Sequence, residues 1–213
     1  MEMTLPIFDR LENLFIGDSH ISLLTTRSSP FLLRVQNVLG KKYCNSFHGF
    51  RGKNTNGIRT ILSPILKPKR RIQAVVIIVG TNSACHDERW ESNEEIRNNI
   101  RAIINRIKEE DPDIFILLNT PPPLRVDIEY KAYEVEKGRS EQKILREQVR
   151  IAEIADLIRE FKGPKVGICD LFKAFSEKDG NWYVDDAHLS EDAEDIWATM
   201  VLCELRNVGI MGS

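Results

Sequence analysis

The chain has 213 residues, and 42% of them are hydrophobic, so it can bury a substantial core and is expected to form a single domain over residues 1–213. Its formal net charge is −2 with acidic and basic residues well mixed, which excludes a basic field that would attract nucleic acid. The basic run 67–71 contains a proline and precedes an apolar segment, so we interpret it as a solvated loop, with phosphate binding as the alternative.

The start of the chain and its apolar runs bear on cellular location. Residues 1–6 lack the basic start and the apolar stretch of a secretory signal, and no apolar run is long enough to span a bilayer. The four cysteines are scattered without a close pair, which is typical of reduced thiols and not of a zinc knuckle or a disulfide scaffold. We therefore expect a cytoplasmic protein without a membrane span.

Apolar runs and helix-period stretches alternate along the chain. Short runs rich in branched and aromatic residues predict strands at 12–16, 43–47, 73–79, 113–119 and 165–170. The stretches between and after them predict helices at 21–40, 55–66, 92–110, 141–162 and 191–208. This alternation predicts an α/β protein with a five-stranded parallel sheet and crossover helices on both faces. The run at 73–79 has no polar alternation and is expected at the centre of the sheet.

The connection from Thr120 to Ser140 is longer than most connections in such folds and begins with three prolines. It is expected to be irregular. It leaves the carboxyl end of the fourth strand, so it is either a flap over a site or a plain surface excursion. Both interpretations stay open at the level of sequence.

Four short polar motifs follow the strands of the predicted sheet. They are Gly-Asp-Ser-His at 17–20, Gly-Phe-Arg-Gly-Lys-Asn at 49–54, Gly-Thr-Asn-Ser at 80–83 and Asp-Asp-Ala-His-Leu-Ser at 185–190. Ligands bind at the carboxyl ends of the strands in a doubly wound sheet. The motifs therefore bring a hydroxyl, glycine amides, a carboxamide and an Asp/His pair to one edge.

These groups match the requirements of acyl transfer. A serine hydroxyl becomes a nucleophile when an imidazole takes its proton, and a carboxylate orients that imidazole. Ser19, His188 and Asp185 can fill these roles. The oxyanion of the tetrahedral intermediate needs fixed donors, for which the N–H groups of Ser19 and Gly52 and the carboxamide of Asn82 are suitable.

Other residues compete for the base and for its carboxylate. His20, His48 and His86 are rival bases, but none has a carboxylate three residues earlier, as His188 does. Asp186 competes with Asp185 for the role of the carboxylate that orients His188.

The four motifs resemble the conserved blocks of the SGNH hydrolases, also called GDSL esterases and lipases, and the resemblance covers nearly the whole chain. The segment 120–124 is similar to small intracellular members such as the isoamyl acetate-hydrolysing esterases. The resemblance implies a flavodoxin-like three-layer α/β/α sandwich. It also implies a serine esterase that needs no metal or other cofactor, and it favours Asp185 over Asp186.

The implied substrate is a short acyl or acetyl ester of an alcohol, a sugar or a lysophospholipid. Transfer of the acyl group to an acceptor other than water is an alternative. A catalytically silent flavodoxin-like binding module is the non-enzymatic alternative, although the phosphate-cradling first loop of a flavin site is missing. Two residues depart from the family pattern: His20 replaces a leucine and Ser83 an aspartate. Both are expected to border the substrate pocket, together with Trp182.

Overall fold

The computed structural model describes residues 11–40, 42–66, 71–85, 87–125, 128–177 and 180–210. Three features predicted from sequence lie outside these ranges: residues 1–6, most of the basic run (67–70), and His86. Five strands form one parallel sheet in the order β2-β1-β3-β4-β5. Their bounds are β1 Glu12–Gly17, β2 Cys44–Gly49, β3 Ile72–Ile78, β4 Phe115–Asn119 and β5 Val166–Cys169. The predicted five-stranded parallel sheet, with 73–79 at its centre, is confirmed.

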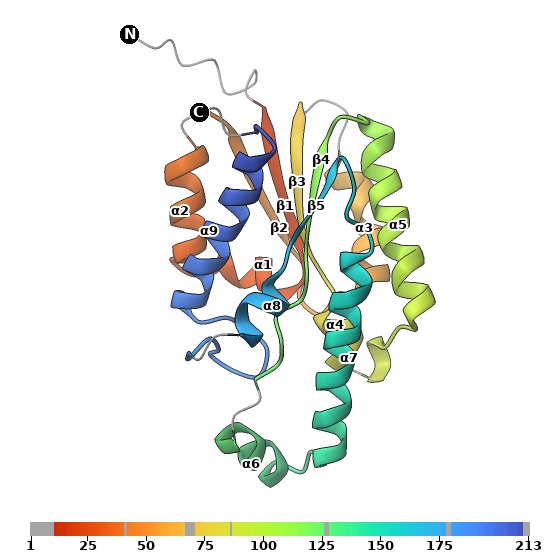
Figure 1. The fold of residues 1–213 in the computed structure, drawn as a ribbon, viewed down its shortest axis with the longest axis vertical. Coiled ribbons are helices and arrows are strands. Elements are labelled where there is room, and N and C mark those ends of the chain that lie inside the picture. Colours follow the sequence, from red (N-terminus) through yellow and green to blue (C-terminus); the bar gives the residue numbers. More distant parts are fainter. Residues whose placement is uncertain are drawn as a thin grey trace.

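Helices cover both faces of the sheet, which gives the predicted three-layer sandwich (Figure 1). One face is covered by α1 (Ser19–Leu24), α2 (Pro30–Leu39), α8 (Leu171–Ser176) and α9 (Glu191–Asn207). The other is covered by α3 (Thr55–Ile65), α5 (Asn93–Glu110) and α7 (Glu141–Arg159). The short elements are α4 (Thr81–Cys85), the 3₁₀ helix η2 (Asp87–Arg89) and α6 (Ile128–Glu136).

The two hydrophobic cores explain the unbroken apolar pattern of the central strand. Val75 and Ile77 point to the core beneath α3, α5 and α7, whereas Val76 and Ile78 point to the core beneath α2 and α9. Successive side chains of a strand face opposite sides, so a strand covered on both sides must be apolar at every position. All five residues from Val75 to Val79 are accordingly buried.

The helix predicted at 21–40 is wrong, because the structure has two helices there. The first, α1, ends at Leu24, and the second, α2, begins at Pro30. Proline has no N–H and fits the first turn of a helix but not its interior. Ser29 precedes it as the N-cap, and its hydroxyl accepts a hydrogen bond from the N–H of Leu32.

The segment 120–140 also differs from its prediction, because it contains α6. The apolar residues of 128–136 alternate with charged ones without a clear stripe, so periodicity gave no helical signal. In Figure 1 α6 lies at the lower end of the molecule, beyond the carboxyl ends of the strands. No helix among the described residues is long and apolar enough to cross a membrane.

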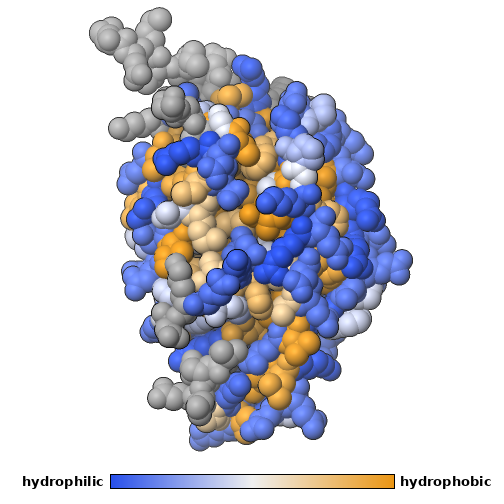
Figure 2. Space-filling model, in the orientation of Figure 1, coloured by the Kyte–Doolittle hydropathy of each residue, from blue (hydrophilic) through white to orange (hydrophobic). Residues whose placement is uncertain are grey.

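The surface is mostly hydrophilic on the face shown in Figure 2, with hydrophobic side chains along the lower part of α7. Leu145 and Val149 of α7 are among the exposed large hydrophobic residues.

Candidate active site

Ser19 lies at the carboxyl edge of the sheet, because it is the first residue of α1 and only Asp18 separates it from the end of β1. Asp18 caps this helix by accepting a hydrogen bond from the N–H of His20. The neighbouring strand β2 ends at Gly49, where a Cβ atom would lie only 2.0 Å from the backbone nitrogen of Ser22. Glycine at this position therefore lets α1 pack directly against the end of β2.

Ser19, His188 and Asp185 form one hydrogen-bonded chain. The Nε2 atom of His188 lies 2.9 Å from Oγ of Ser19, and its Nδ1 lies 2.6 Å from Oδ2 of Asp185. The other carboxylate oxygen of Asp185 accepts hydrogen bonds from the backbone N–H groups of His188, at 2.7 Å, and Ala187, at 3.0 Å. Since a carboxylate only accepts, Nδ1 carries a hydrogen, and in the neutral ring Nε2 is then an acceptor for the Ser19 hydroxyl.

The electrostatics of this chain keep Asp185 ionised. Partial burial alone would raise the pKa of its carboxyl group. The hydrogen bonds from the His188 ring and from the two backbone amides outweigh burial and hold that pKa well below its ordinary value. Asp185 is therefore a carboxylate at neutral pH, able to stabilise a positive charge on His188.

Asp186 occupies a different environment from Asp185. Its Oδ2 lies 3.6 Å from Nη1 of Arg139, and its backbone oxygen accepts a hydrogen bond from Arg125 at 2.9 Å. Burial, together with the negative charge of Asp185, raises the pKa of its carboxyl group. The structure thus places Asp185, and not Asp186, against His188.

Gly52 lies in the loop after β2, and Asn82 lies in the short helix after β3. Gly52 has a φ of +72°, a backbone conformation that side chains disfavour. Asn82 belongs to α4, and its Nδ2 donates to Oδ2 of Asp18 at 3.4 Å and to the backbone oxygen of Lys53 at 3.2 Å. Its Oδ1 accepts a hydrogen bond from Nη1 of Arg89 at 3.2 Å. If the amide of Asn82 were flipped, its oxygen would face the oxygens of Asp18 and Lys53, and its NH₂ group would face the guanidinium of Arg89. The orientation given is therefore the one consistent with hydrogen bonding.

Two of the three residues expected to contact substrate are buried. His20 is 3% exposed, and its ring nitrogens lie 2.9 Å from Oδ1 of Asp18 and 3.1 Å from the backbone oxygen of Ala187. Ser83 is 0% exposed, and its hydroxyl donates to a carboxylate, that of Glu91. Both side chains are almost fully buried and hydrogen-bonded inside the protein, which departs from the expectation that both border the pocket.

Trp182, the third residue expected to contact substrate, is half-buried. Its ring lies 5.6 Å from that of Phe175, centroid to centroid. Trp182 therefore packs against α8. In the sequence it stands six residues before His188.

Sequence reasoning missed a buried carboxylate near the site. Glu91 is 5% exposed, and no short motif marks it. Its two oxygens accept hydrogen bonds from donors at the start of α3, in α4 and in α5; the donor residues are Thr55, Asn56, Ser83 and Asn99. Buried charges are tolerated when they are hydrogen-bonded in this way. Glu91 thereby fixes α4, which carries Asn82, against α3, and the serine at position 83 is one of its donors.

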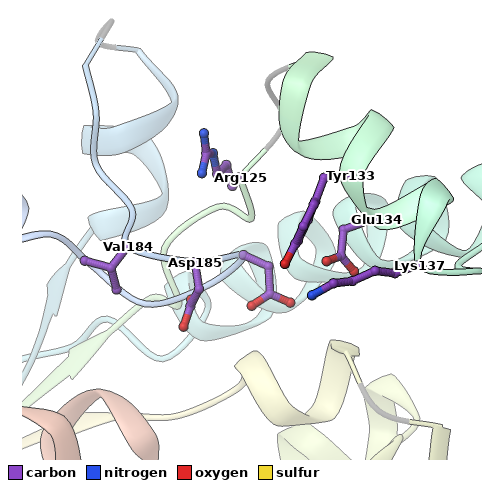
Figure 3. Close-up of a pocket in the computed structure, with 7 residues that line it drawn as sticks. Arg125, Tyr133, Glu134, Lys137, Val184 and Asp185 are labelled. Carbon is purple, nitrogen blue, oxygen red and sulfur yellow. The ribbon is translucent and has the colours of Figure 1, made fainter.

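A cavity of about 490 Å³ lies between α6 and the loop that carries Asp185 (Figure 3). Its lining residues are Arg125, Tyr133, Glu134, Lys137, Val184, Asp185 and Asp186. Neither Ser19 nor His188 is among them, so the cavity lies beside the Ser–His–Asp chain and not above the serine. Within the described ranges, no group of three or more His, Cys, Asp or Glu side chains is arranged to hold a metal ion.

Comparisons with known proteins identify a family and solved structures of similar fold. The family model described as GDSL-like lipase/acylhydrolase matches residues 15–196. A comparison with curated proteins gives no match.

Among solved structures, the chain is similar to a carbohydrate acetylesterase family member from Sinorhizobium meliloti, with 17% identity, 93% of this chain and 98% of that chain covered, and a TM-score of 0.69. It is similar to the acetyl xylan esterase AlAXEase, with 20% identity, coverage of 92% and 100%, and a TM-score of 0.62. It is also similar to the catalytic domain of peptidoglycan O-acetyltransferase A from Streptococcus pneumoniae, with 16% identity, coverage of 93% and 94%, and a TM-score of 0.61. These structures share the fold of this chain.

Proposed function

The chain belongs to the GDSL-like lipase/acylhydrolase family and is a carboxylic ester hydrolase, and we propose that Ser19 is its nucleophile, His188 its general base and Asp185 the carboxylate that orients the base. The observation that carries this proposal is the continuous hydrogen-bonded chain from Ser19 through His188 to Asp185. Each distance is within the range in which a proton is transferred or held. The roles follow from this order of contacts.

The first half of the reaction forms an acyl-enzyme. Oγ of Ser19 attacks the carbonyl carbon of the ester while Nε2 of His188 takes the hydroxyl proton. The tetrahedral intermediate then collapses and the carbon–oxygen bond to the alcohol breaks. The leaving alcohol takes the proton from Nε2. Asp185 stabilises the imidazolium that exists between these two proton transfers.

The second half releases the acid. Water attacks the acyl carbon, Nε2 of His188 takes a proton from that water, and the second tetrahedral intermediate forms. Its collapse breaks the bond to Oγ of Ser19, which recovers the proton from His188. The products are the carboxylic acid and the alcohol, and the enzyme returns to its starting state.

Donors for the oxyanion come from three loops at the same edge. The N–H of Ser19, the first residue of α1, has no acceptor within the helix. The backbone N–H of Gly52 is the second proposed donor, since glycine has no side chain that would block the approach of the substrate. The Nδ2 group of Asn82 is the third proposed donor, and its long hydrogen bond of 3.4 Å to Asp18 is the one that gives way to an oxyanion.

For the substrate we propose a short acyl group, acetyl in the first instance, on an alcohol, a sugar or a lysophospholipid. The similar solved structures include an acetyl xylan esterase and a carbohydrate acetylesterase family member, which supports an acetyl ester. The cytoplasmic location predicted from sequence remains a prediction.

Activity-based labelling tests the proposal. A fluorophosphonate probe should label the wild-type protein at Ser19, and the protein should hydrolyse para-nitrophenyl acetate. Ser19→Ala should abolish labelling and lower kcat by about ten-thousand-fold or more, the usual loss when a triad nucleophile is removed.

The matched control is Ser22→Ala, which removes a serine from the same short helix. Among the described residues, its hydroxyl accepts one long hydrogen bond, of 3.4 Å from Arg51, so labelling should persist. Labelling at a residue other than Ser19, or full activity of Ser19→Ala, would refute the assignment.

A further inference from the structure

Arg89 lies against two of the three proposed oxyanion donors. Its Nη1 donates to Oδ1 of Asn82 at 3.2 Å. A Cβ atom at Gly52 would lie 3.0 Å from the same Nη1 and 3.1 Å from Cζ, so the guanidinium group is packed on the backbone of Gly52. The backbone oxygen of Arg89 is in turn held by Nδ2 of Asn54 at 3.0 Å. The group is therefore fixed between the loops that follow β2 and β3.

The guanidinium group of Arg89 keeps donors that no ion pair in the described part of the chain uses. In the described part of the chain, no carboxylate forms an ion pair with Arg89. Asp87 pairs with two cations of α7, and Glu91 accepts hydrogen bonds from uncharged donors near α3. A guanidinium has five N–H donors, and one amide oxygen uses only one of them.

The loop after β2 carries two further cations. Arg51 and Lys53 flank Gly52 in the loop after β2, and both are exposed. Asp18, the nearest acid of the nucleophile loop, is fully buried and directed to His20 and Asn82. A half-buried cation beside a reacting centre, with further cations around it, attracts an anion.

We propose that Arg89 binds an anionic group, a carboxylate or a phosphate, that the ester substrate carries close to its reacting carbonyl. The proposal rests on the proposed function, since it names the substrate class of that same site. Guanidinium groups bind planar carboxylates and phosphates through paired charge-assisted hydrogen bonds, which fix orientation as well as charge. Binding such a group beside Asn82 would set the carbonyl oxygen toward the oxyanion donors.

Matched ester pairs test this proposal. One pair has the charge on the leaving group: para-acetoxybenzoate and its uncharged amide, with para-acetoxyphenyl phosphate as the phosphate arm. The other has it on the acyl group: para-nitrophenyl hydrogen adipate and its uncharged amide. The wild-type protein should favour the charged member of at least one pair in kcat/KM by about tenfold or more, the size expected of a charge-assisted contact.

Arg89→Met should bring this ratio close to one, mainly by raising KM for the charged ester. The control is Arg101→Met, which removes the same charge from an exposed arginine in the middle of α5 that is likewise bonded to an amide oxygen, that of Asn98. For Arg101→Met, the ratio of kcat/KM between the charged and the uncharged ester should equal that of the wild type.

Three results would overturn the proposal. The first is a wild-type protein without preference for either charged ester, which needs no variant. The second is a preference that persists in Arg89→Met. The third is an equal loss of kcat on charged and uncharged esters in Arg89→Met with an unchanged ratio, which would reduce Arg89 to a residue that positions Asn82. Failure of the proposed function looks different: Ser19 is not labelled and no ester is cleaved, and the substrate proposal falls with it.

Discussion

Replacing the buried His20 by leucine, the residue usual in this family, should destabilise the protein most at low pH. Both ring nitrogens of His20 face acceptors, Oδ1 of Asp18 and the backbone oxygen of Ala187. A backbone oxygen and a carboxylate oxygen both accept, so both contacts are hydrogen bonds when the ring carries a hydrogen on each nitrogen, as an imidazolium does. Burial alone would lower the pKa of His20, but the charge of Asp18 and the hydrogen bonds to Asp18 and Ala187 raise it above the ordinary value.

The loss of unfolding free energy depends on which hydrogen-bond partners Asp18 loses and which it keeps. Breaking a buried ion pair by removing one partner costs about 3–5 kcal/mol. Asp18 keeps the backbone N–H at position 20 and the amide of Asn82, and leucine adds apolar surface to the interior. We therefore expect a loss of about 2–3 kcal/mol at pH 6, below the full cost of an unpaired buried charge.

The loss should shrink as pH rises. A raised pKa in the folded state means that the stabilisation is fully present below the unfolded pKa of about 6.5 and is lost as pH rises through the folded pKa. The charged or titratable groups that face the ring are Asp18, Asp185 and His188. They remain in the variant, so the difference in unfolding free energy between the two proteins isolates His20.

Urea unfolding from pH 6 to pH 9 measures this difference. With a slope of about 3 kcal/mol per M, the midpoint of His20→Leu should fall by about 1 M at pH 6 and by less at pH 9. A cycle with Asp18→Asn should show that most of the loss is coupling between the two side chains. The reasoning fails if the difference is independent of pH, or if His20→Leu is the more stable protein at pH 6.

Three further predictions concern activity. Asp185→Asn should lower kcat far more than Asp186→Asn, since only Asp185 contacts His188, and a greater effect at Asp186 in ester hydrolysis would contradict the assignment. Asn82→Ala should lower kcat by about a hundredfold or more, the usual loss of one oxyanion donor, and a change confined to KM would indicate ground-state binding instead. Replacing residues 125–138 by a short Gly/Ser link should change the kcat/KM ratio between short and longer acyl esters while fluorophosphonate labelling persists, and an unchanged profile would assign the segment to the surface.

The sheet and the motifs at its edge were predictable because their signals are local. An apolar run that must be buried on both faces predicts a central strand, and β3 matches it. Polar motifs directly after such runs must lie at the carboxyl edge, which is why Ser19 and Asn82 could be placed there from sequence. The boundary between α1 and α2 also has a local signal, since Ser29 is an N-cap residue and Pro30 follows it. Apolar periodicity across this boundary nevertheless favoured one long helix.

The partners of buried polar side chains could not be predicted in the same way. Ser83 and His20 were expected at the pocket because they follow Asn82 and Ser19 in the chain. The structure directs both inward, toward Glu91 and Asp18. The direction of a side chain one position along a short helix depends on where acceptors lie in the folded molecule, and a sequence motif does not encode that. No sequence motif marks Arg89, because its contacts with Asn82 and Gly52 join different parts of the chain.

The geometry of the Ser–His–Asp chain depends on how the irregular loop before α9 is held, because His188 is 169 residues away from Ser19. Within the loop, the N–H of Val184 donates to the oxygen of His188 at 2.9 Å. From the nucleophile side, His20 bonds the oxygen of Ala187, and from the side of α6, Arg125 bonds the oxygen of Asp186. The loop is thus held from within and from two sides. Loss of the contact from 125–138 therefore leaves the other two in place, which is why that deletion should alter ester selectivity and spare the reactivity of Ser19.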